Sequence, residues 1–423
     1  MSFSEWREIK LGDLVEVSSS KRIYAKEYVD SGIPFYRSKE IIEKSKGNDV
    51  STELYISKER FNELKNKFGA PSLGDILLTS VGTLGVPYIV RKEEFYFKDG
   101  NLTWIKNFKD NCHNKFIFYW LLSPDGVYQI NTRCIGSTQK ALTIDTLKKF
   151  ELKIPPFEEQ KAIAHILSTL DDKIEVNNQI NKTLENMAQA IFKQWFVDFE
   201  FPNEDGEPYK SSGGEMVESE LGMIPEGWGV KELGEIIDII KQGTKPGEHL
   251  KDRKYNPIDT LPMKSIAIND FKPYEEAKSS LILFEKYDIL IGAMRVYFHR
   301  VNLAPYKGIT RTTTFVLRSK RIQDVPYNLF LLNMDETIDY AERTSKGSTM
   351  PYAVWDNGMS NMLTAYSNKE LRNNFFEIIQ PMLETIMKRS AENEVLIKLR
   401  DSILPKLMSG KIRVPLDLEG DVS

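Results

Sequence analysis

Cysteine, histidine and long hydrophobic runs are scarce in this sequence. Its 423 residues include two cysteines and four scattered histidines, so we expect neither a disulfide framework nor a metal site. No apolar stretch approaches the roughly 18 residues of a membrane span, and the first residues lack the basic start and apolar core of a signal peptide. We therefore expect a cytoplasmic protein without membrane contact, in which Cys112 and Cys134 are ordinary thiols.

The composition otherwise fits a globular chain of two to three domains, with 41% hydrophobic and 28% charged residues. The net charge of -4 argues against a protein that coats nucleic acid without selectivity, because such binding needs many phosphate contacts. The acidic excess is concentrated in residues 151–226, and the segments before and after it are neutral or slightly basic. Two small basic faces are compatible with this pattern, as is ordinary solvated surface charge.

The second half of the sequence repeats the first in order and in nearly constant spacing. Three short motifs mark the repeat, with Trp6, Leu11-Gly12-Asp13 and Gly136-Ser137-Thr138 recurring as Trp228, Leu233-Gly234-Glu235 and Gly347-Ser348-Thr349. Two copies are too few for a solenoid, so the repeat favours a pseudo-twofold arrangement of two similar domains.

A long helical pattern follows each copy. From Glu158 onward, apolar residues and asparagines fall at alternating steps of four and three, which is a heptad seam. Prolines at 155, 156 and 202 bracket it and predict a helix of about 40 residues, on the order of 60 Å long. The seam of this first helix is Leu167, Leu170, Ile174, Asn177, Asn181, Leu184 and Ile191.

The second helix begins near Lys369. Its predicted seam contains Asn393, Leu396, Ile403 and Leu407, together with Phe375, Ile378, Met382, Ile386 and Leu399. Asparagines within a seam fix the register of paired helices at some cost in stability. We expect the two helices to pair with each other, in antiparallel or parallel direction. The alternative is that each helix packs only on its own domain.

Residues 202–227 separate the first helix from the second domain. They are rich in acids and turn-forming residues, which predicts a flexible crossover.

Taken together, these features resemble the DNA-specificity (S) subunits of Type I restriction-modification systems. The resemblance rests on the Leu-Gly-Asp/Glu opening after a Trp, the Gly-Ser-Thr loop followed by Glu159-Gln160 and a long helix, and the linker segment Pro208–Gly214. It covers essentially the whole chain. The second copy departs from the pattern where Glu370-Leu371 replaces Glu159-Gln160.

The resemblance implies a fold and a set of partners. It implies a duplicated α/β (α+β) chain in which two globular target-recognition domains alternate with two long helices, and we expect these helices to form an antiparallel coiled coil with pseudo-twofold symmetry. The implied partners are double-stranded DNA, two methyltransferase (M) subunits and, in the full complex, motor-nuclease (R) subunits. The expected divisions are 1–155 for the first recognition domain, 156–200 for the first spacer helix, 201–227 for the linker, 228–367 for the second recognition domain, 368–414 for the second spacer helix and 415–423 for a tail.

No catalytic site is expected in this chain. Pro155-Pro156-Phe157 is similar to the motif with which amino-methyltransferases hold their target amine, but Ile154 stands where a hydrogen-bonding side chain is required. The resemblance places S-adenosylmethionine, ATP and Mg on the partner subunits, and no cofactor or metal on this chain. Two alternatives remain open, a coiled-coil scaffold whose repeated domains bind protein and a restriction enzyme complete in itself.

The candidate DNA-binding residues lie on polar loops in corresponding places of the two copies. Basic and hydroxyl side chains suit phosphate contacts, Arg suits guanine, and Gln suits adenine. Solvated turns would have a similar composition, and core packing would equally explain the aromatic side chain. The candidates in the first copy are Lys21, Arg22, Ser80, Thr83, Ser137, Thr138, Gln139 and Lys140. Those in the second are Lys241, Gln242, Thr244, Lys245, Arg295, Tyr297, Arg300, Lys346, Ser348 and Thr349.

Overall fold

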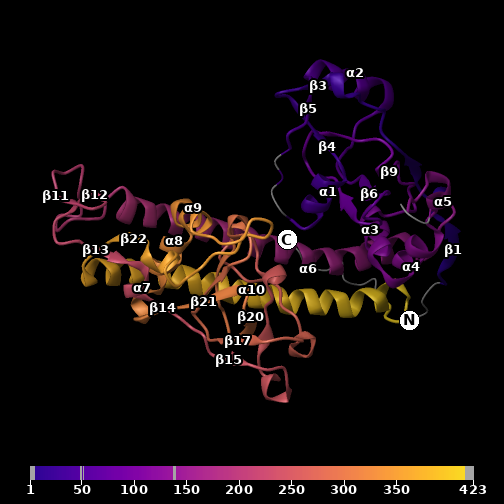
Figure 1. The fold of residues 1–423 in the computed structure, drawn as a ribbon. Helices are drawn as coiled ribbons and strands as arrows, with labels where there is room; N and C mark the ends of the chain where they lie inside the picture. The colour runs from indigo at the N-terminus through magenta and orange to yellow at the C-terminus, as the bar shows by residue number, and fades with distance from the viewer. Residues whose placement is uncertain (1–4, 48–49, 51, 137–139, 415–423) are drawn as a thin grey trace. The chain divides into compact units, whose positions relative to one another are not determined.

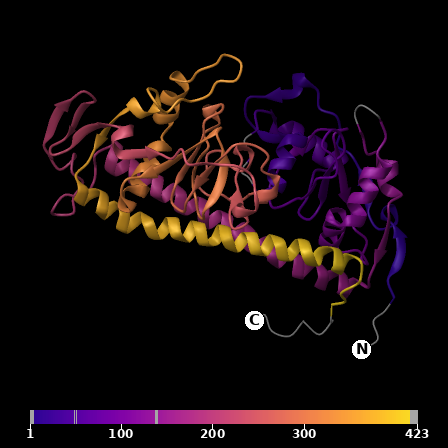
Figure 2. The same cartoon turned by 60° about the horizontal axis from the view of Figure 1, so that its bottom comes forward.

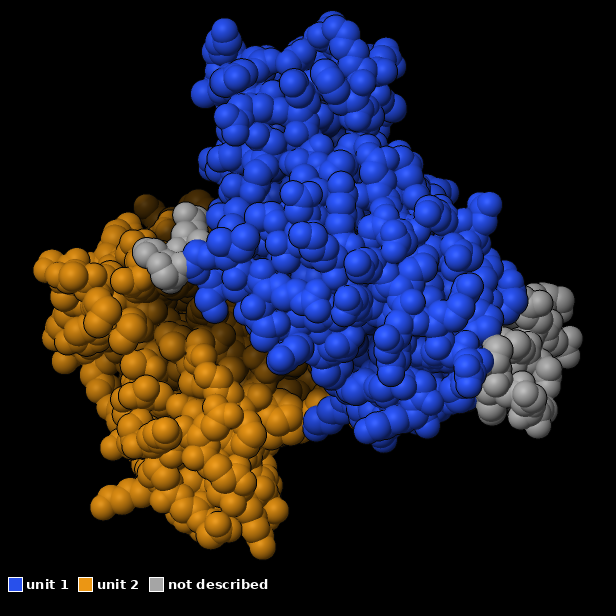
Figure 3. Space-filling view, turned by 90° about the vertical axis from the view of Figure 1, so that its right-hand side faces the viewer, with its two compact units in different colours: residues 1–175, 396–423 blue, residues 176–395 orange. Residues whose placement is uncertain are grey.

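The computed structural model describes residues 5–47, 50, 52–136 and 140–414. The chain divides into two compact units, of which unit 1 contains residues 1–175 and 396–423 and unit 2 contains residues 176–395 (Figure 3). Two long helices, α6 (Phe157–Phe192) and α10 (Lys369–Met408), contribute residues to both units (Figure 1). A five-residue π-helix, Lys193–Val197, continues α6.

The globular part of unit 1 contains one two-stranded ribbon and two four-stranded sheets. The ribbon pairs its first strand, β1, antiparallel with its last, β10. One sheet has the all-antiparallel order β2-β9-β6-β7, and the other has the order β3-β5-β4-β8, in which β4 and β8 are parallel. The strands are β1 (Arg7–Lys10), β2 (Glu16–Ser18), β3 (Tyr28–Val29), β4 (Ile33–Tyr36), β5 (Tyr55–Ile56), β6 (Ile76–Thr79), β7 (Pro87–Ile89), β8 (Tyr96–Phe97), β9 (Leu102–Lys106) and β10 (Glu151–Ile154).

Helices pack around these sheets. Ser123 caps α4, because its hydroxyl accepts a hydrogen bond from the Gly126 N–H at 3.3 Å and Pro124 occupies the first turn. The helices of this part are α1 (Ser38–Ser45), α2 (Lys58–Phe68), α3 (Asn114–Leu122), α4 (Pro124–Arg133) and α5 (Ile144–Lys148).

The globular part of unit 2 repeats the ribbon and the first sheet. Strands β13 and β22 pair antiparallel, as β1 and β10 do, and the sheet β14-β21-β18-β19 has the same order and directions as β2-β9-β6-β7. The second sheet, β15-β17-β20-β16, retains one parallel pair but has a different order. The strands are β13 (Gly229–Glu232), β14 (Ile237–Ile239), β15 (Gly243–Thr244), β16 (Lys254–Tyr255), β17 (Leu281–Phe284), β18 (Ile289–Gly292), β19 (Val301–Leu303), β20 (Gly308–Arg311), β21 (Thr314–Ser319) and β22 (Leu363–Tyr366).

The strands β6 and β18 contribute side chains to the core in the same way. Ile76 and Leu78 face one apolar cluster and Leu77 faces another, because successive side chains of a strand point to opposite faces. In unit 2, Ile289 and Ile291 face one apolar cluster and Leu290 faces another. The helices of this globular part are α7 (Leu233–Ile236), α8 (Val325–Leu332) and α9 (Asp335–Arg343).

Within unit 2, α6 and α10 lie side by side (Figure 2). Asn177 donates to the side chains of Asn393 and Glu392, each at 2.9 Å, and Asn181 donates to Ser390 at 3.4 Å. The residue numbers of these contacts therefore decrease along α10 as they increase along α6. The first helix also packs on the globular part, since Glu185 accepts the Ile266 N–H at 2.9 Å.

In unit 1, the remaining segments of the two helices are also in contact. Asp171 of α6 pairs with Arg400 of α10 at 2.7 Å. The carboxylate of Glu159, which is only 3% exposed, accepts hydrogen bonds from Arg413 at 2.6 and 2.8 Å. Arg413 lies just after the end of α10, and the residue numbers of these two pairs again decrease on the C-terminal segment as they increase along α6.

Among the seam residues of unit 1, Leu167 and Leu407 are buried in the unit 1 core, and Leu170, Ile174, Leu396 and Ile403 are half-buried. In unit 2, Asn177, Asn181 and Asn393 are buried, and Leu184 and Ile191 are half-buried. Burial of a seam position identifies the face of the helix that packs.

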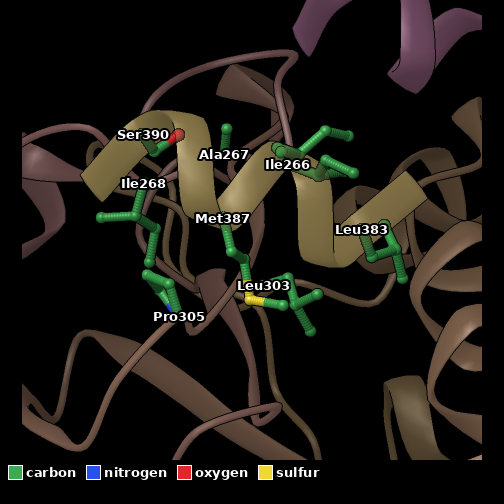
Figure 4. A pocket seen from close by; sticks show the side chains of 9 residues that line it. Ile266, Ala267, Ile268, Leu303, Pro305, Leu383, Met387 and Ser390 are labelled. Atoms are coloured by element: carbon green, nitrogen blue, oxygen red, sulfur yellow. The ribbon is translucent and has the colours of Figure 1, made fainter. Parts of the chain in front are cut away.

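The predicted seam of the second helix is partly wrong. Ile378 and Leu399 are 40% and 45% exposed. The buried apolar positions of this helix in unit 2 are Leu371, Phe375, Ile379, Leu383, Ile386 and Met387. The phase differs because this face of α10 packs on the globular part, where Figure 4 shows Met387 and Leu383 turned toward Leu303. Their close fit leaves a cavity of only about 10 Å³.

The prediction of a flexible crossover is also wrong. The segment contains a hairpin of β11 (Met216–Ser219) and β12 (Gly222–Pro225). Phe201 stacks between Tyr209 and Trp228, with ring centroids 4.5 and 5.6 Å apart, and Glu200 accepts hydrogen bonds from the N–H and hydroxyl of Ser211. Aromatic stacking and side-chain hydrogen bonds therefore fix a segment whose composition alone suggests a flexible linker.

Candidate nucleic-acid interface

Unit 1 brings together two loops that are far apart in the sequence. The loop that follows β6 meets the loop that follows α4, because the Leu142 N–H donates to the Ser80 carbonyl at 2.9 Å and Val81 forms a bridge with Ala141. Ile135 and Ala141 exchange backbone hydrogen bonds, each 2.8 Å long. We call this meeting of loops the loop junction.

Unit 2 contains the same loop junction. The Ala353 N–H donates to the Ala293 carbonyl at 2.8 Å, and Lys346 and Tyr352 exchange backbone hydrogen bonds of 2.9 Å. Met294 forms a bridge with Tyr352. The turn passes through Gly347, whose φ of 91° lies in the left-handed region that favours glycine. The junction is therefore built twice from backbone contacts that do not depend on side-chain identity.

The candidate residues at the unit 1 junction differ in orientation. Ser80 is buried, and its hydroxyl hydrogen-bonds to the Thr103 hydroxyl and the Leu78 carbonyl, so it faces the interior. Thr83 and Lys140 are exposed. Three further candidates, Ser137, Thr138 and Gln139, lie outside the described residues.

The basic pair Lys21 and Arg22 lies beside the turn between β8 and β9. The Lys21 N–H donates to the Tyr96 hydroxyl at 2.9 Å, and Arg22, 65% exposed, donates to Asp99 at 2.9 Å. The hydrogen bond and the charge of Asp99 raise the pKa of Arg22 above its ordinary value. Because Asn101 of the same turn accepts the Ser80 N–H, this turn connects the basic pair with the loop junction.

At the unit 2 junction, the exposed candidates point away from the core. Arg295 adopts a left-handed φ of 52°, and its N–H donates to the Pro351 carbonyl at 2.8 Å. Tyr297 is 42% exposed. The candidates of the paired polar loop, Lys346, Ser348 and Thr349, are all exposed.

Arg300 is directed inward. Its guanidinium donates to the Leu261 carbonyl, and burial lowers its pKa below the ordinary value. The side chain therefore holds the segment before residue 262 against β19, and its charge is half-buried.

The structure separates the four candidates that follow β14. Lys241 lies next to the loop junction, where its ammonium donates to Asp356 at 2.6 Å. Gln242, Thr244 and Lys245 run along the second sheet, where the Gln242 carbonyl accepts the Leu283 N–H and the Thr244 hydroxyl contacts His249 at 2.9 Å.

A cleft of about 470 Å³ opens at the unit 2 junction. Its lining combines an apolar wall with a polar mouth and includes residues that the sequence analysis missed, namely Met294, Thr312, Thr313, Phe315, Met350, Tyr352, Trp355 and Asp356. The repeated Gly-Ser-Thr motif directly precedes Met350, so extending that motif by a few residues would have found part of this wall.

The described residues contain no group of three or more His, Cys, Asp or Glu side chains placed to hold a metal ion. Cys112 and Cys134 are both free thiols. Within the same residues, no helix combines the length and apolarity needed to cross a membrane. The geometry at the two loop junctions offers exposed cations and hydroxyls, which suit contacts to nucleic acid.

Comparison with known proteins agrees with this geometry. The family model for the Type I restriction modification DNA specificity domain matches residues 3–186 and 225–356. The chain is 27% identical over 437 residues to the Type I restriction enzyme MjaIX specificity subunit of Methanocaldococcus jannaschii, covering 97% of this chain and 94% of that protein. It is 36% identical over 185 residues to a putative type I restriction enzyme specificity subunit, S.HindORF215P, of Haemophilus influenzae, covering 43% of each.

A solved structure shares the fold. The crystal structure of the Type I restriction-modification system S subunit from M. genitalium matches with a TM-score of 0.58 at 15% identity, covering 96% of both chains. The family model spans well over half of the present chain and includes both copies of the repeat. The chain therefore belongs to the DNA-specificity subunits of Type I restriction-modification systems, the non-catalytic DNA-recognition components of these systems.

Proposed function

We propose that each globular part reads one half of a bipartite DNA sequence. The observation that carries this proposal is the loop junction, which occurs once in each unit with the same backbone contacts and different side chains. Equivalent scaffolds with different exposed groups would recognise different half-sites, because base edges in the major groove are distinguished by hydrogen bonding and apolar contact. Residues 1–155 and 228–367 are the two recognition domains in this proposal.

The two long helices then set the gap between the half-sites as an antiparallel coiled coil. Two contacts support this arrangement, that of Asn177 with Asn393 in unit 2 and that of Asp171 with Arg400 in unit 1. Between the two contacts, a higher residue number on α6 goes with a lower residue number on α10. The helices at 156–200 and 368–414 would be related by a pseudo-twofold axis, with the linker at 201–227 between them.

Partner subunits complete the function. We propose that the two helices dock two methyltransferase subunits, and that motor-nuclease subunits join in the restricting complex. S-adenosylmethionine, ATP and Mg would be bound by those partners. The support is membership of the family.

The proposal is tested by single-molecule sequencing of DNA from cells that express this chain with its cognate methyltransferase. Cells with the methyltransferase alone are the control. We expect an asymmetric motif, split into two halves, that is methylated only when this chain is present. Methylation that is independent of this chain, despite an active methyltransferase, would refute the proposal and favour a protein-binding scaffold.

The spacer role has its own test. Removing one heptad from each helix, residues 177–183 and 387–393, keeps the heptad phase and shortens the pair by about 10 Å, which corresponds to about three base pairs. The two half-sites serve as an internal control, because residues 1–155 and 228–367 keep their sequence. We expect the same half-sites with a shorter gap, and an unchanged gap in a methylating complex would refute the spacer role.

A further inference from the structure

The cleft at the unit 2 loop junction has a charged mouth. Lys241 and Asp356, which both line the cleft, form an ion pair of 2.6 Å, and their side chains are 61% and 66% exposed. An exposed pair of this kind contributes roughly 0–1 kcal/mol to folding. The contribution of the ion pair to folding stability therefore does not explain why it lies at the junction.

The surroundings of the pair indicate what the cleft accepts. Lys241 and Asp356 are the charged residues of the lining. Arg295 and Lys346 lie outside it but are exposed on the loops that form the junction, and such cations suit a polyanion. The wall of the cleft is apolar and includes Met294 and Tyr352. When DNA covers this wall, water is excluded and polar contacts at the mouth become more selective.

A carboxylate at such a surface restricts the bases that can face it. Asp356 is repelled by phosphates, and when ionised it only accepts hydrogen bonds. In the major groove, the donors are the amino groups of cytosine N4 and adenine N6, whereas guanine and thymine present acceptors. Lys241 offsets the charge of Asp356 and fixes one of its oxygens, which leaves the other oxygen available for a base.

We propose that Asp356, positioned by Lys241, is a specificity-determining residue that selects an amino-bearing base, cytosine or adenine, at one position of the half-site read by unit 2. This inference rests on the proposed function, because it assigns part of the base selection of that site. Lys241 is a positioning residue in this arrangement. Guanine and thymine are rejected because their acceptors would face the carboxylate.

The test uses the full chain in complex with its cognate methyltransferase. The motif is first determined with the wild-type chain, and methylation rates are then measured on duplexes in which each recognised position carries each of the four bases. Asp356→Asn supplies both a donor and an acceptor and removes the charge. Asp238→Asn is the matched control, because Asp238 forms an exposed pair with Lys320 outside the cleft lining.

We expect Asp356→Asn to reduce the preference for cytosine or adenine over guanine or thymine by roughly tenfold. The effect should occur at one position of one half-site, and Asp238→Asn should keep the wild-type preferences. Unchanged selectivity, or a uniform loss of rate at all positions of both halves, would overturn the inference while leaving the bipartite reading intact. If the wild-type chain directs no split motif, the proposed function itself fails.

Discussion

Glu185 makes the folding stability of unit 2 depend on pH. This residue of α6 is only 6% exposed, and its carboxylate accepts hydrogen bonds from the Ile266 N–H at 2.9 Å and the Ser265 hydroxyl at 3.2 Å. Burial raises the pKa of Glu185 to about 7, against the opposing effects of these two hydrogen bonds and of Lys182. The residue thus holds α6 against the globular part through a carboxyl group that titrates near neutrality.

The direction of the effect follows from the raised pKa. A folded-state pKa above the unfolded value of 4.5 means that the folded protein holds the proton more tightly. The stabilisation of the folded protein by this proton is complete at a pH below the unfolded-state pKa, and it is lost as the pH rises through about 7. A difference of this size corresponds to about 3 kcal/mol in the free energy of unfolding.

The substitution Glu185→Gln isolates this contribution. Glutamine keeps the acceptor for the Ile266 N–H and cannot ionise, so the variant should gain stability relative to wild type as the pH rises from about 4.5 to 8, by about 3 kcal/mol. Denaturant unfolding of the full chain at several pH values, followed by a probe in unit 2, measures the difference. Glu377→Gln changes an exposed glutamate of α10 in the same unit and is the control. A Glu185→Gln difference that stays constant with pH would contradict this reasoning.

Two further substitutions test buried polar contacts. Asn177→Ala removes the partner of Asn393 and of Arg389, which donates to Asn177 at 2.8 Å, and should lower the free energy of unfolding by about 2 kcal/mol; a double-mutant cycle with Asn393→Ala that shows no coupling would contradict this. Arg372→Ala leaves Asp324, paired at 2.9 Å and 5% exposed, without its buried partner and should cost about 3 kcal/mol in denaturant unfolding. Arg372→Lys should cost less, because it keeps the charge.

Much of the scaffold can be predicted from the sequence, because it depends on local patterns. The apolar runs at 76–78 and 289–291 form the central strands β6 and β18, and the heptad pattern after Glu158 forms α6. The repeated motifs also predict equivalent elements, and the first sheet has the same strand order in both units. Periodicity and repetition are properties of the chain itself, so they are visible before folding.

The remaining features depend on tertiary contacts. The buried face of α10 in unit 2 is set by the globular part as well as by α6, and a heptad count cannot weigh one partner against the other. The linker is ordered by Phe201, Tyr209 and Trp228, which are separated along the chain. Glu159 is buried against Arg413, whereas its counterpart in the repeat, Glu370, is exposed. Equivalent positions therefore lie in different environments.

The candidate site shows the same division. The sequence identifies the loops of both junctions, because glycine and hydroxyl residues recur there. The sequence does not show which way Ser80 and Arg300 point. The Ser80 hydroxyl hydrogen-bonds to the Thr103 hydroxyl, and the Arg300 guanidinium donates to the Leu261 carbonyl. Asp356 could not be identified, because its proximity to Lys241 exists only in the folded chain.

In the function that we propose, the construction of the loop junction explains how one scaffold can carry two different recognition surfaces. The contacts that close it are backbone hydrogen bonds, Leu142 to Ser80 in unit 1 and Ala353 to Ala293 in unit 2. Backbone hydrogen bonds can be kept when exposed side chains change, so the cost of altering a reading residue falls on DNA selectivity and little on folding. In contrast, β6 and β18 are packed on both faces, and substitutions there would affect the fold. New specificities are therefore expected to arise at the loops while the strands that position them are retained.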